Sequence, residues 1–143
     1  RLISAVAHKY ASPSGILASK YDFLPAAASD KGEIMDATLT TFFAVEPHIR
    51  ALGITREKGR DLVDAIVSKS LKYPHSMMVV HRDSGKLIGV RLMSEWQRDS
   101  KEEVLHIELD EGSTILLSIL DNLKSEFWNI RADAKKVLRR EIT

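Results

Sequence analysis

A single proline marks the point at which the apolar middle of this 143-residue chain must change direction. Pro47 directly follows Glu46 after the mostly apolar run Thr41–Val45, and the segment that begins at Pro47 closes at Gly53. Proline disfavours helical geometry in the residue before it and suits the first position of a new helix. The pattern therefore predicts a helix, a break at Glu46, and a short second helix that ends at Gly53.

Length and composition limit the classes to which the chain belongs. A chain of this length with 44% hydrophobic and 29% charged residues is typical of one soluble globular domain. The formal net charge of +1 gives no case for a nucleic-acid or membrane partner, and no apolar run approaches membrane-spanning length. The absence of cysteine excludes disulfides, zinc–thiolate sites and a cysteine nucleophile.

Residues 1–20 differ in composition from the rest of the chain. They contain Arg1, Lys9 and Lys20 but no acidic residue, and they are rich in serine and alanine. This composition is typical of a disordered leader, which we favour, or of a mitochondrial transit peptide. A disordered leader is compatible with a cytoplasmic protein, whereas a transit peptide would indicate a mitochondrial one. Because the chain begins at Arg1 rather than at methionine, we expect a processed, trimmed or partial protein, with the folded domain at residues 21–143.

Hydrophobic periodicity predicts the elements of the first half. The aromatic and apolar run Tyr21–Ala27 is typical of a strand. Asp30 and Glu33 have the spacing of a capping box for a helix that runs to about Phe43. After the break, Thr55 is placed to cap another helix, whose apolar stripe comprises Leu62, Val63, Ile66, Val67 and Leu71.

The second half predicts a hairpin, a helix and a final strand. Residues 76–82 and 87–96 flank the turn 83–86, and Gly89 permits a bulge or a close backbone approach. Residues 97–111 are expected to form a loop, with enough alternation at 104–109 for a short strand. A helix from Ser113 or Thr114 to about Phe127 follows, and residues 137–143 resemble a strand. The expected buried face of that helix comprises Leu116, Ile119, Leu120, Leu123 and Phe127. The order of elements predicts an α+β or mixed α/β domain.

Glu46 is the strongest candidate for chemistry. A general base for an amine must remove a proton from a group with a pKa of about 10. A carboxylate can do this directly or through a water molecule. The helix that begins after Glu46 favours the charged form of the carboxylate, and it would equally favour a simple helix cap. The residues alone leave both interpretations open.

Other constellations of reactive residues are weak. The histidines at 48, 75, 81 and 106 have no metal-ligand spacing, so we expect surface or hairpin positions and no metal site. No Gly-x-Ser-x-Gly motif supports a hydrolase triad, and the seven scattered glycines form no phosphate-binding loop. A basic patch near the C-terminus lacks interleaved aromatic residues, which favours a solvated linker over a contact with nucleic acid. The patch consists of Arg131, Lys135, Lys136, Arg139 and Arg140.

The stretch Phe42–Gly53, with Phe-Phe, Glu-Pro and Leu-Gly in that order, resembles the arylalkylamine N-acetyltransferase-like branch of the GNAT superfamily. The helix that follows, the hairpin Met78–Val90 and the later helix that leads to Lys136–Leu138 are also similar to that family. The resemblance therefore runs from about Tyr21 to the end of the chain. It implies a GNAT-like mixed sheet with flanking helices, and acetyl transfer from acetyl-CoA to a small amine. It also implies that Glu46 is the general base, acting through water, and that Phe43 and Pro47 border the amine pocket.

The sequence departs from that family at its end. The family binds the coenzyme pyrophosphate at an Arg/Gln-x-x-Gly-x-Gly/Ala loop, which the resemblance places after residues 137–143, where this sequence stops. We therefore expect the N-terminal part of a GNAT domain, with weak or no activity of its own and an open strand edge able to self-associate. The rival interpretation is a non-catalytic interaction module, a truncated isoform that associates through that edge. A third is a small ligand-binding α+β domain in which Glu46 caps a helix.

Overall fold

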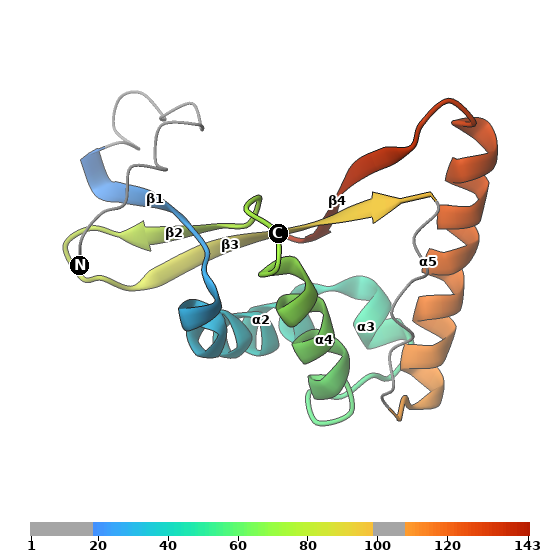
Figure 1. Cartoon of the computed structure of the whole chain (residues 1–143). Helices are drawn as coiled ribbons and strands as arrows, with labels where there is room; N and C mark the ends of the chain where they lie inside the picture. Colours follow the sequence, from blue (N-terminus) through green and yellow to red (C-terminus); the bar gives the residue numbers. More distant parts are fainter. Residues whose placement is uncertain (1–18, 99–107) are drawn as a thin grey trace.

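The computed structural model describes residues 19–98 and 108–143 (Figure 1). The expected leader and the expected short strand at 104–109 therefore fall almost wholly outside the described residues. The described elements confirm the expected α/β class, and their bounds lie within a few residues of the predicted ones. They are β1 (Tyr21–Pro25), a 3₁₀ helix η2 (Ala28–Asp30), α2 (Lys31–Val45), α3 (Pro47–Ala51), α4 (Arg60–Ser70), β2 (Met77–His81), β3 (Leu87–Gln97), α5 (Glu111–Ile130) and β4 (Lys136–Ile142).

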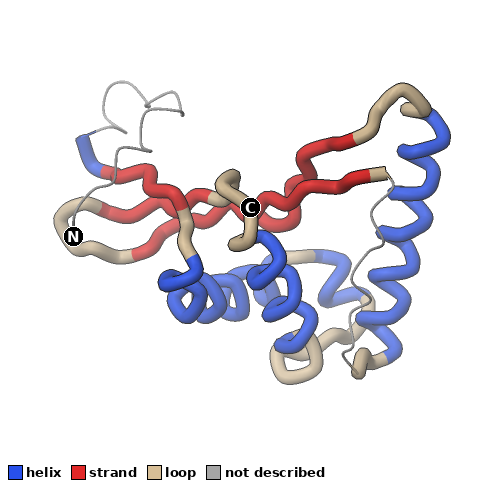
Figure 2. The backbone as a smooth tube through the Cα atoms, viewed as in Figure 1, coloured by secondary structure: helices blue, strands red, loops and turns tan. Residues whose placement is uncertain are grey.

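The four strands form one sheet in the order β1-β2-β3-β4, and each pair is antiparallel (Figures 1 and 2). Strands β1 and β4 therefore lie at the two edges of the described sheet. The register between β2 and β3 shifts next to Val79, which pairs with Gly89. This bulge agrees with the prediction made from Gly89, and it leaves Ile88 49% exposed.

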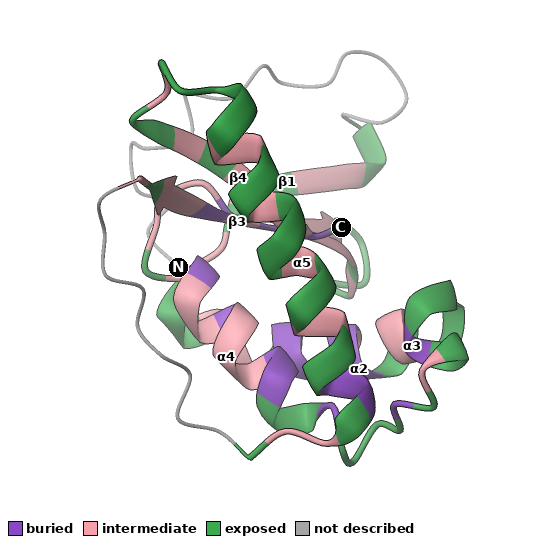
Figure 3. Ribbon diagram, turned by 90° about the vertical axis from the view of Figure 1, so that its right-hand side faces the viewer, coloured by how far each residue is buried: buried purple, intermediate pink, exposed green. Residues whose placement is uncertain are grey.

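Helices α2 and α4 pack on one face of the sheet and enclose the core (Figure 1). Both helices present apolar residues at helical spacing, which is the pattern that buries one stripe of a helix. Figure 3 shows that buried residues gather in these two helices. The core cluster comprises Ile34, Met35, Leu39, Val63, Val67, Met78, Leu92 and Ile142.

The starts of α2 and α4 differ from the predicted caps. The Asp30 carboxylate makes no bond to the first turn of α2 and instead accepts a hydrogen bond from the Ala27 amide at 2.9 Å. The expected capping box of Asp30 with Glu33 is therefore wrong, because the preceding 3₁₀ turn uses the carboxylate. The Thr55 hydroxyl accepts a hydrogen bond from the Lys58 amide at 3.3 Å and so closes a turn before α4, which begins at Arg60.

Helix α5 differs most from the prediction. Its cap is Asp110, whose side chain accepts a hydrogen bond from the Ser113 amide at 2.8 Å, rather than Ser113 or Thr114. Two residues of the expected buried face are exposed, Ile119 at 48% and Leu123 at 57%. The reason is visible in Figure 1, where α5 stands apart from α2 and α4, and Figure 3 shows its long exposed surface.

The two ends of α5 hold it to the rest of the described chain. At its start, Gly112 lies so close to α3 that a Cβ would be 2.6 Å from the Leu52 carbonyl oxygen. At its end, the Trp128 ring lies 6.4 Å from the Trp96 ring of β3, centroid to centroid. The Arg98 guanidinium donates hydrogen bonds to the carbonyls of Trp128 and Arg131 and thereby satisfies carbonyls at the helix C-terminus.

Candidate functional site

Glu46 lies at the predicted break between two helices. Its backbone is extended, with φ −72° and ψ 115°, and its amide donates a 2.9 Å hydrogen bond to the Phe42 carbonyl at the end of α2. Pro47 then begins α3, and the Arg50 amide donates a 3.3 Å bond to the Glu46 carbonyl. The main chain of Glu46 is thus held from both sides, as the proline rule predicts.

The Glu46 side chain does not cap α3, although the residue occupies the N-cap position. Its Oε1 atom lies 2.6 Å from Nδ1 of His48. The side chain of Glu46 is 30% exposed and that of His48 is 73% exposed, so solvent reaches the pair. The third interpretation, a carboxylate that only caps a helix, has no support in this geometry, and the role of general base stays a prediction.

His48 is exposed, as predicted for a surface position, and its contact with Glu46 is the feature that the sequence did not predict. Side chains two residues apart diverge within a helix. They meet here because Glu46 precedes the helix and has extended geometry. The available signal was the Glu-Pro-His order at a predicted helix start.

The predicted neighbours of Glu46 lie in different environments. Phe43 is half-buried in the last turn of α2, and its ring contacts Phe42 edge-to-face at 6.2 Å between centroids. The Phe43 ring also lies against the start of α4, where a Cβ on Gly59 would be 2.2 Å from Phe43 Cζ. Pro47 is exposed. The structure thus brings Phe43 and Pro47 to the two sides of the break at Glu46.

Packing beneath α3 fixes the position of the break. Ile49 is 2% exposed and anchors α3, and Ile54 is 5% exposed after the turn. Gly53 has φ 63°, a left-handed conformation that suits glycine, and it lets the Ile54 amide return to the Ile49 carbonyl at 3.1 Å. The short helix is therefore held by its buried side, while Glu46 and His48 stay on its open side.

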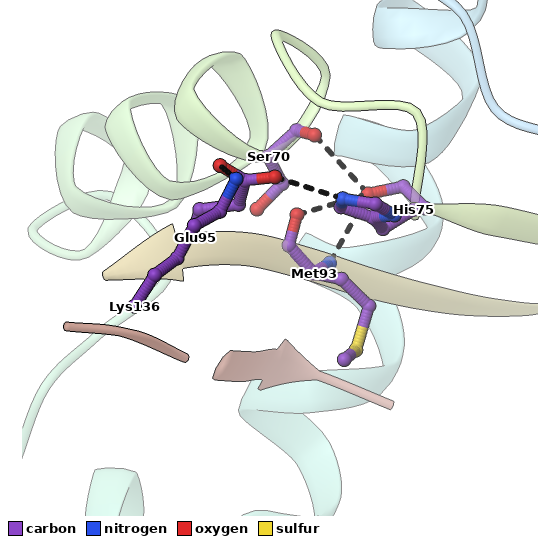
Figure 4. Close-up of polar contacts among 6 residues, drawn as sticks. Ser70, His75, Met93, Glu95 and Lys136 are labelled. Carbon is purple, nitrogen blue, oxygen red and sulfur yellow. Dashed lines mark hydrogen bonds and ion pairs between the residues drawn. The ribbon is translucent and has the colours of Figure 1, made fainter. Parts of the chain in front are cut away.

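A second polar cluster joins the end of α4 to the sheet (Figure 4). Nε2 of His75 lies 3.0 Å from Oε1 of Glu95, and Nζ of Lys136 lies 2.5 Å from Oε2 of the same carboxylate. The hydrogen bonds from Lys136 and His75 lower the pKa of Glu95. With 14% of its side chain exposed and both oxygens engaged, Glu95 is suited to linking β3 to β4 rather than to accepting a substrate proton.

Most of the basic patch near the C-terminus is neutralised by neighbouring groups. Arg131 pairs with Asp133 at 2.9 Å, and Lys136 pairs with Glu95. The Arg139 guanidinium lies 4.5 Å from the centroid of the Trp96 ring, where the cation faces the aromatic surface. These contacts give no support to a nucleic-acid surface. The expected solvated linker is wrong for Lys136, Arg139 and Arg140, because these residues lie in strand β4.

Residues 19–98 and 108–143 contain no group of three acidic, histidine or cysteine side chains that could hold a metal ion. No helix in these ranges is long and apolar enough to cross a membrane. The cytoplasmic or mitochondrial location therefore stays a prediction.

Comparisons with known proteins place this geometry in a known fold. The structure superimposes on arylalkylamine N-acetyltransferase 2 from Aedes aegypti with a TM-score of 0.70 and 24% identity, over 85% of this chain and 59% of that chain. The chain has an acetyltransferase fold. This finding confirms the resemblance to the GNAT fold that the Phe-Phe to Leu-Gly stretch predicted.

Two further solved structures are similar to this chain. A putative arylalkylamine N-acetyltransferase 7 from the same mosquito gives a TM-score of 0.65 at 15% identity, over 85% of this chain and 52% of that chain. The C-terminal condensation domain of Ebony, in complex with β-alanyl-dopamine, gives 0.60 at 17% identity, over 77% of this chain and 50% of that chain. The chain therefore spans little more than half the length of these structures. No protein-family model matches it, and no curated protein matches it significantly by sequence.

The starts of helices α2, α4 and α5 do not fit the pyrophosphate of acetyl-CoA. A phosphate site at a helix start needs free amides and favourable charge. At the start of α5, the Asp110 carboxylate already accepts from the Ser113 amide, and hydrogen bonds from Ser113 lower the pKa of Asp110. Asp30 places another carboxylate at the start of α2, and at the start of α4 the Phe43 ring contacts Gly59.

Proposed function

We propose that this chain forms the amine-binding part of an acetyltransferase, which uses acetyl-CoA to acetylate a small amine, and that Glu46 is its general base. One observation carries the proposal. Within an acetyltransferase fold, Glu46 is a solvent-accessible carboxylate at a helix break, and its side chain is not used as a helix cap. The sequence resemblance had assigned the same role to this residue.

The proposed step is a proton transfer. An alkylamine carries a proton at neutral pH, because its pKa is about 10. A bond forms between that proton and the Glu46 carboxylate, directly or through water, and the N–H bond breaks with its electron pair left on nitrogen. The uncharged nitrogen is then a nucleophile for an acyl carbon.

The neighbours of Glu46 support an amine with an aromatic group. The half-buried Phe43 and the exposed Pro47 are both apolar and flank Glu46 in the chain. Two similar structures are named for arylalkylamines, and a third holds β-alanyl-dopamine, an amide of an arylalkylamine. These names support an arylalkylamine as the substrate class.

The proposed reaction also needs contacts with the pyrophosphate of acetyl-CoA, and the helix starts described above do not supply them. The sequence contains no Gly-x-Gly loop, and the helix starts described above carry carboxylates or a packed ring. We therefore expect this chain alone to bind acetyl-CoA weakly and to show little or no turnover. Calorimetric titration with acetyl-CoA checks this expectation, and saturable binding in the micromolar range would contradict it.

An amine titration followed by NMR tests the role of Glu46 without requiring turnover. We expect 2-phenylethylamine to cause saturable shifts in the amide signals of residues 42–48, whereas the matched alcohol 2-phenylethanol causes none. Glu46→Gln removes the charge that pairs with the ammonium group, so affinity should fall about tenfold. Glu126→Gln, at an exposed position of α5, is the matched control and should bind the amine like the original chain. Equal binding by Glu46→Gln would refute the assignment.

The rival proposal is a non-catalytic module that associates through β4. Strand β4 is an edge of the described sheet, and Leu138 on it is 52% exposed. Unpaired strand edges are templates for association. Light scattering across a range of concentrations tests this alternative: a dimer that Leu138→Lys disrupts would support it, and a monomer at all concentrations would exclude it.

A further inference from the structure

The strongest unassigned feature is the histidine next to the candidate base. His48 lies in the first turn of α3, and its carbonyl accepts a 3.0 Å hydrogen bond from the Leu52 amide, so its backbone is fixed. The adjacent Ile49 is buried and holds the helix in place. The imidazole is nevertheless 73% exposed, and its one contact to a described side chain is Nδ1 to Glu46 Oε1 at 2.6 Å.

Two hydrogen-bond donors compete for the Glu46 carboxylate. A glutamate at an N-cap can turn toward the amides of the first helical turn, because those amides have no partner within the helix. In this structure the carboxylate contacts the imidazole instead. The contact uses Oε1 and therefore leaves Oε2 for a further partner.

We propose that His48 is the positioning residue of Glu46: its Nδ1–H donates to Oε1 and keeps the carboxylate away from the α3 amides, with Oε2 open to the substrate amine. The inference rests on the proposed function and names a second residue of the same site. The proton taken from the ammonium group forms a bond to Oε2, while the imidazole keeps its own proton on Nδ1. Nε2 then faces solvent as an acceptor.

The tautomer of His48 is a direct readout of this arrangement in the chain as it exists. In water a neutral imidazole prefers the proton on Nε2, whereas donation to Glu46 requires it on Nδ1. We expect long-range ¹H–¹⁵N spectra at about pH 8, where a free imidazole is neutral, to show the Nδ1–H form. Glu46→Gln should increase the Nε2–H form. A His48 with its proton on Nε2 in both proteins would overturn the inference.

Two amide substitutions separate positioning from a structural role. The side-chain NH₂ of asparagine lies close to the place of Nδ1, whereas that of glutamine reaches the place of Nε2. We therefore expect His48→Asn to keep amine affinity within about threefold of the original chain, and His48→Gln and His48→Ala to lose about tenfold, the loss given by removing one charge-assisted hydrogen bond. Thermal unfolding should be similar in all three, because the ring is exposed.

The outcomes distinguish this inference from the proposed function. If the Nδ1–H form is present but Glu46→Gln binds amine unchanged, the pairing exists and the proposed base is wrong. If Glu46→Gln loses affinity while all three His48 variants bind like the original chain, the base assignment holds and the positioning role is wrong. Loss of affinity in His48→Asn equal to that in His48→Gln would also refute the role assigned to Nδ1.

Discussion

Gly59→Ala should destabilise the protein by forcing the Phe43 ring out of its place. A Cβ at position 59 would lie 2.2 Å from Cζ and 2.5 Å from Cε1 of Phe43. Carbon atoms rest about 3.5–4.0 Å apart, so the ring must move by about 1.5 Å. Overpacking of this kind costs about 1–3 kcal/mol. For a domain of this size, that loss corresponds to a decrease in Tm of about 3–10 °C.

The assay is thermal and urea unfolding followed by circular dichroism, with two controls. Gly32 lies in α2 with nothing within 4 Å of an added Cβ, so Gly32→Ala should be neutral or stabilising by up to about 1 kcal/mol. In a Phe43→Ala background, Gly59→Ala should lose most of its cost, because the clashing ring is gone. A Gly59→Ala protein as stable as the original, or an undiminished cost in the Phe43→Ala background, would refute this explanation.

The other predictions concern α5 and the sheet. Gly112→Ala places a Cβ 2.6 Å from the Leu52 carbonyl oxygen, and backbone cannot move aside as a side chain does, so we expect a loss of about 2–3 kcal/mol in urea unfolding. Arg98→Met removes the hydrogen-bond donors to three carbonyls, those of Trp128, Arg131 and Ala134. It should lower the free energy of unfolding by about 2–4 kcal/mol and speed amide exchange in the last turn of α5. Unchanged exchange would contradict the capping role of Arg98. The pKa of Glu95 is lowered from the ordinary glutamic acid value of 4.5 in the folded protein, so the unfolded chain binds a proton at a higher pH than the folded protein does. The stability of the folded protein therefore falls as the pH drops below about 4.5 and through the lowered pKa. Glu95→Gln should flatten this decrease in acid unfolding curves, and an unchanged pH dependence would contradict the assignment.

Local rules predicted much of the fold, including the helix break at Glu46. The break at Glu46 depends on its immediate neighbour Pro47. The turn at Gly53 depends on one positive φ angle, which glycine adopts readily. Both features could therefore be predicted from single residue types. The hairpin of β2 and β3 is similarly local. The fold class followed from the order of these elements.

Contacts between distant residues account for what the sequence did not predict. The helical spacing of Ile119 and Leu123 predicted that they lie on one face of α5. It contained no information on which element, if any, packs against that face. The ring contact between Trp96 and Trp128, which places the end of α5, joins residues far apart in the chain. The contact of His48 with Glu46 was missed for a different reason, since it depends on a change from extended to helical backbone within two residues.

The order of the strands has a consequence for how the protein folds. Each strand pairs with the strand before it in the chain, but the connections between the strands differ greatly in length. The β2–β3 hairpin closes the shortest loop and should form earliest, because short loops cost the least chain entropy. Strand β4 must close the longer segment that contains α5 before it pairs with β3, so we expect it to join later. A hydrogen-exchange pulse during refolding should therefore find the amides of β4 protected after those of β2 and β3.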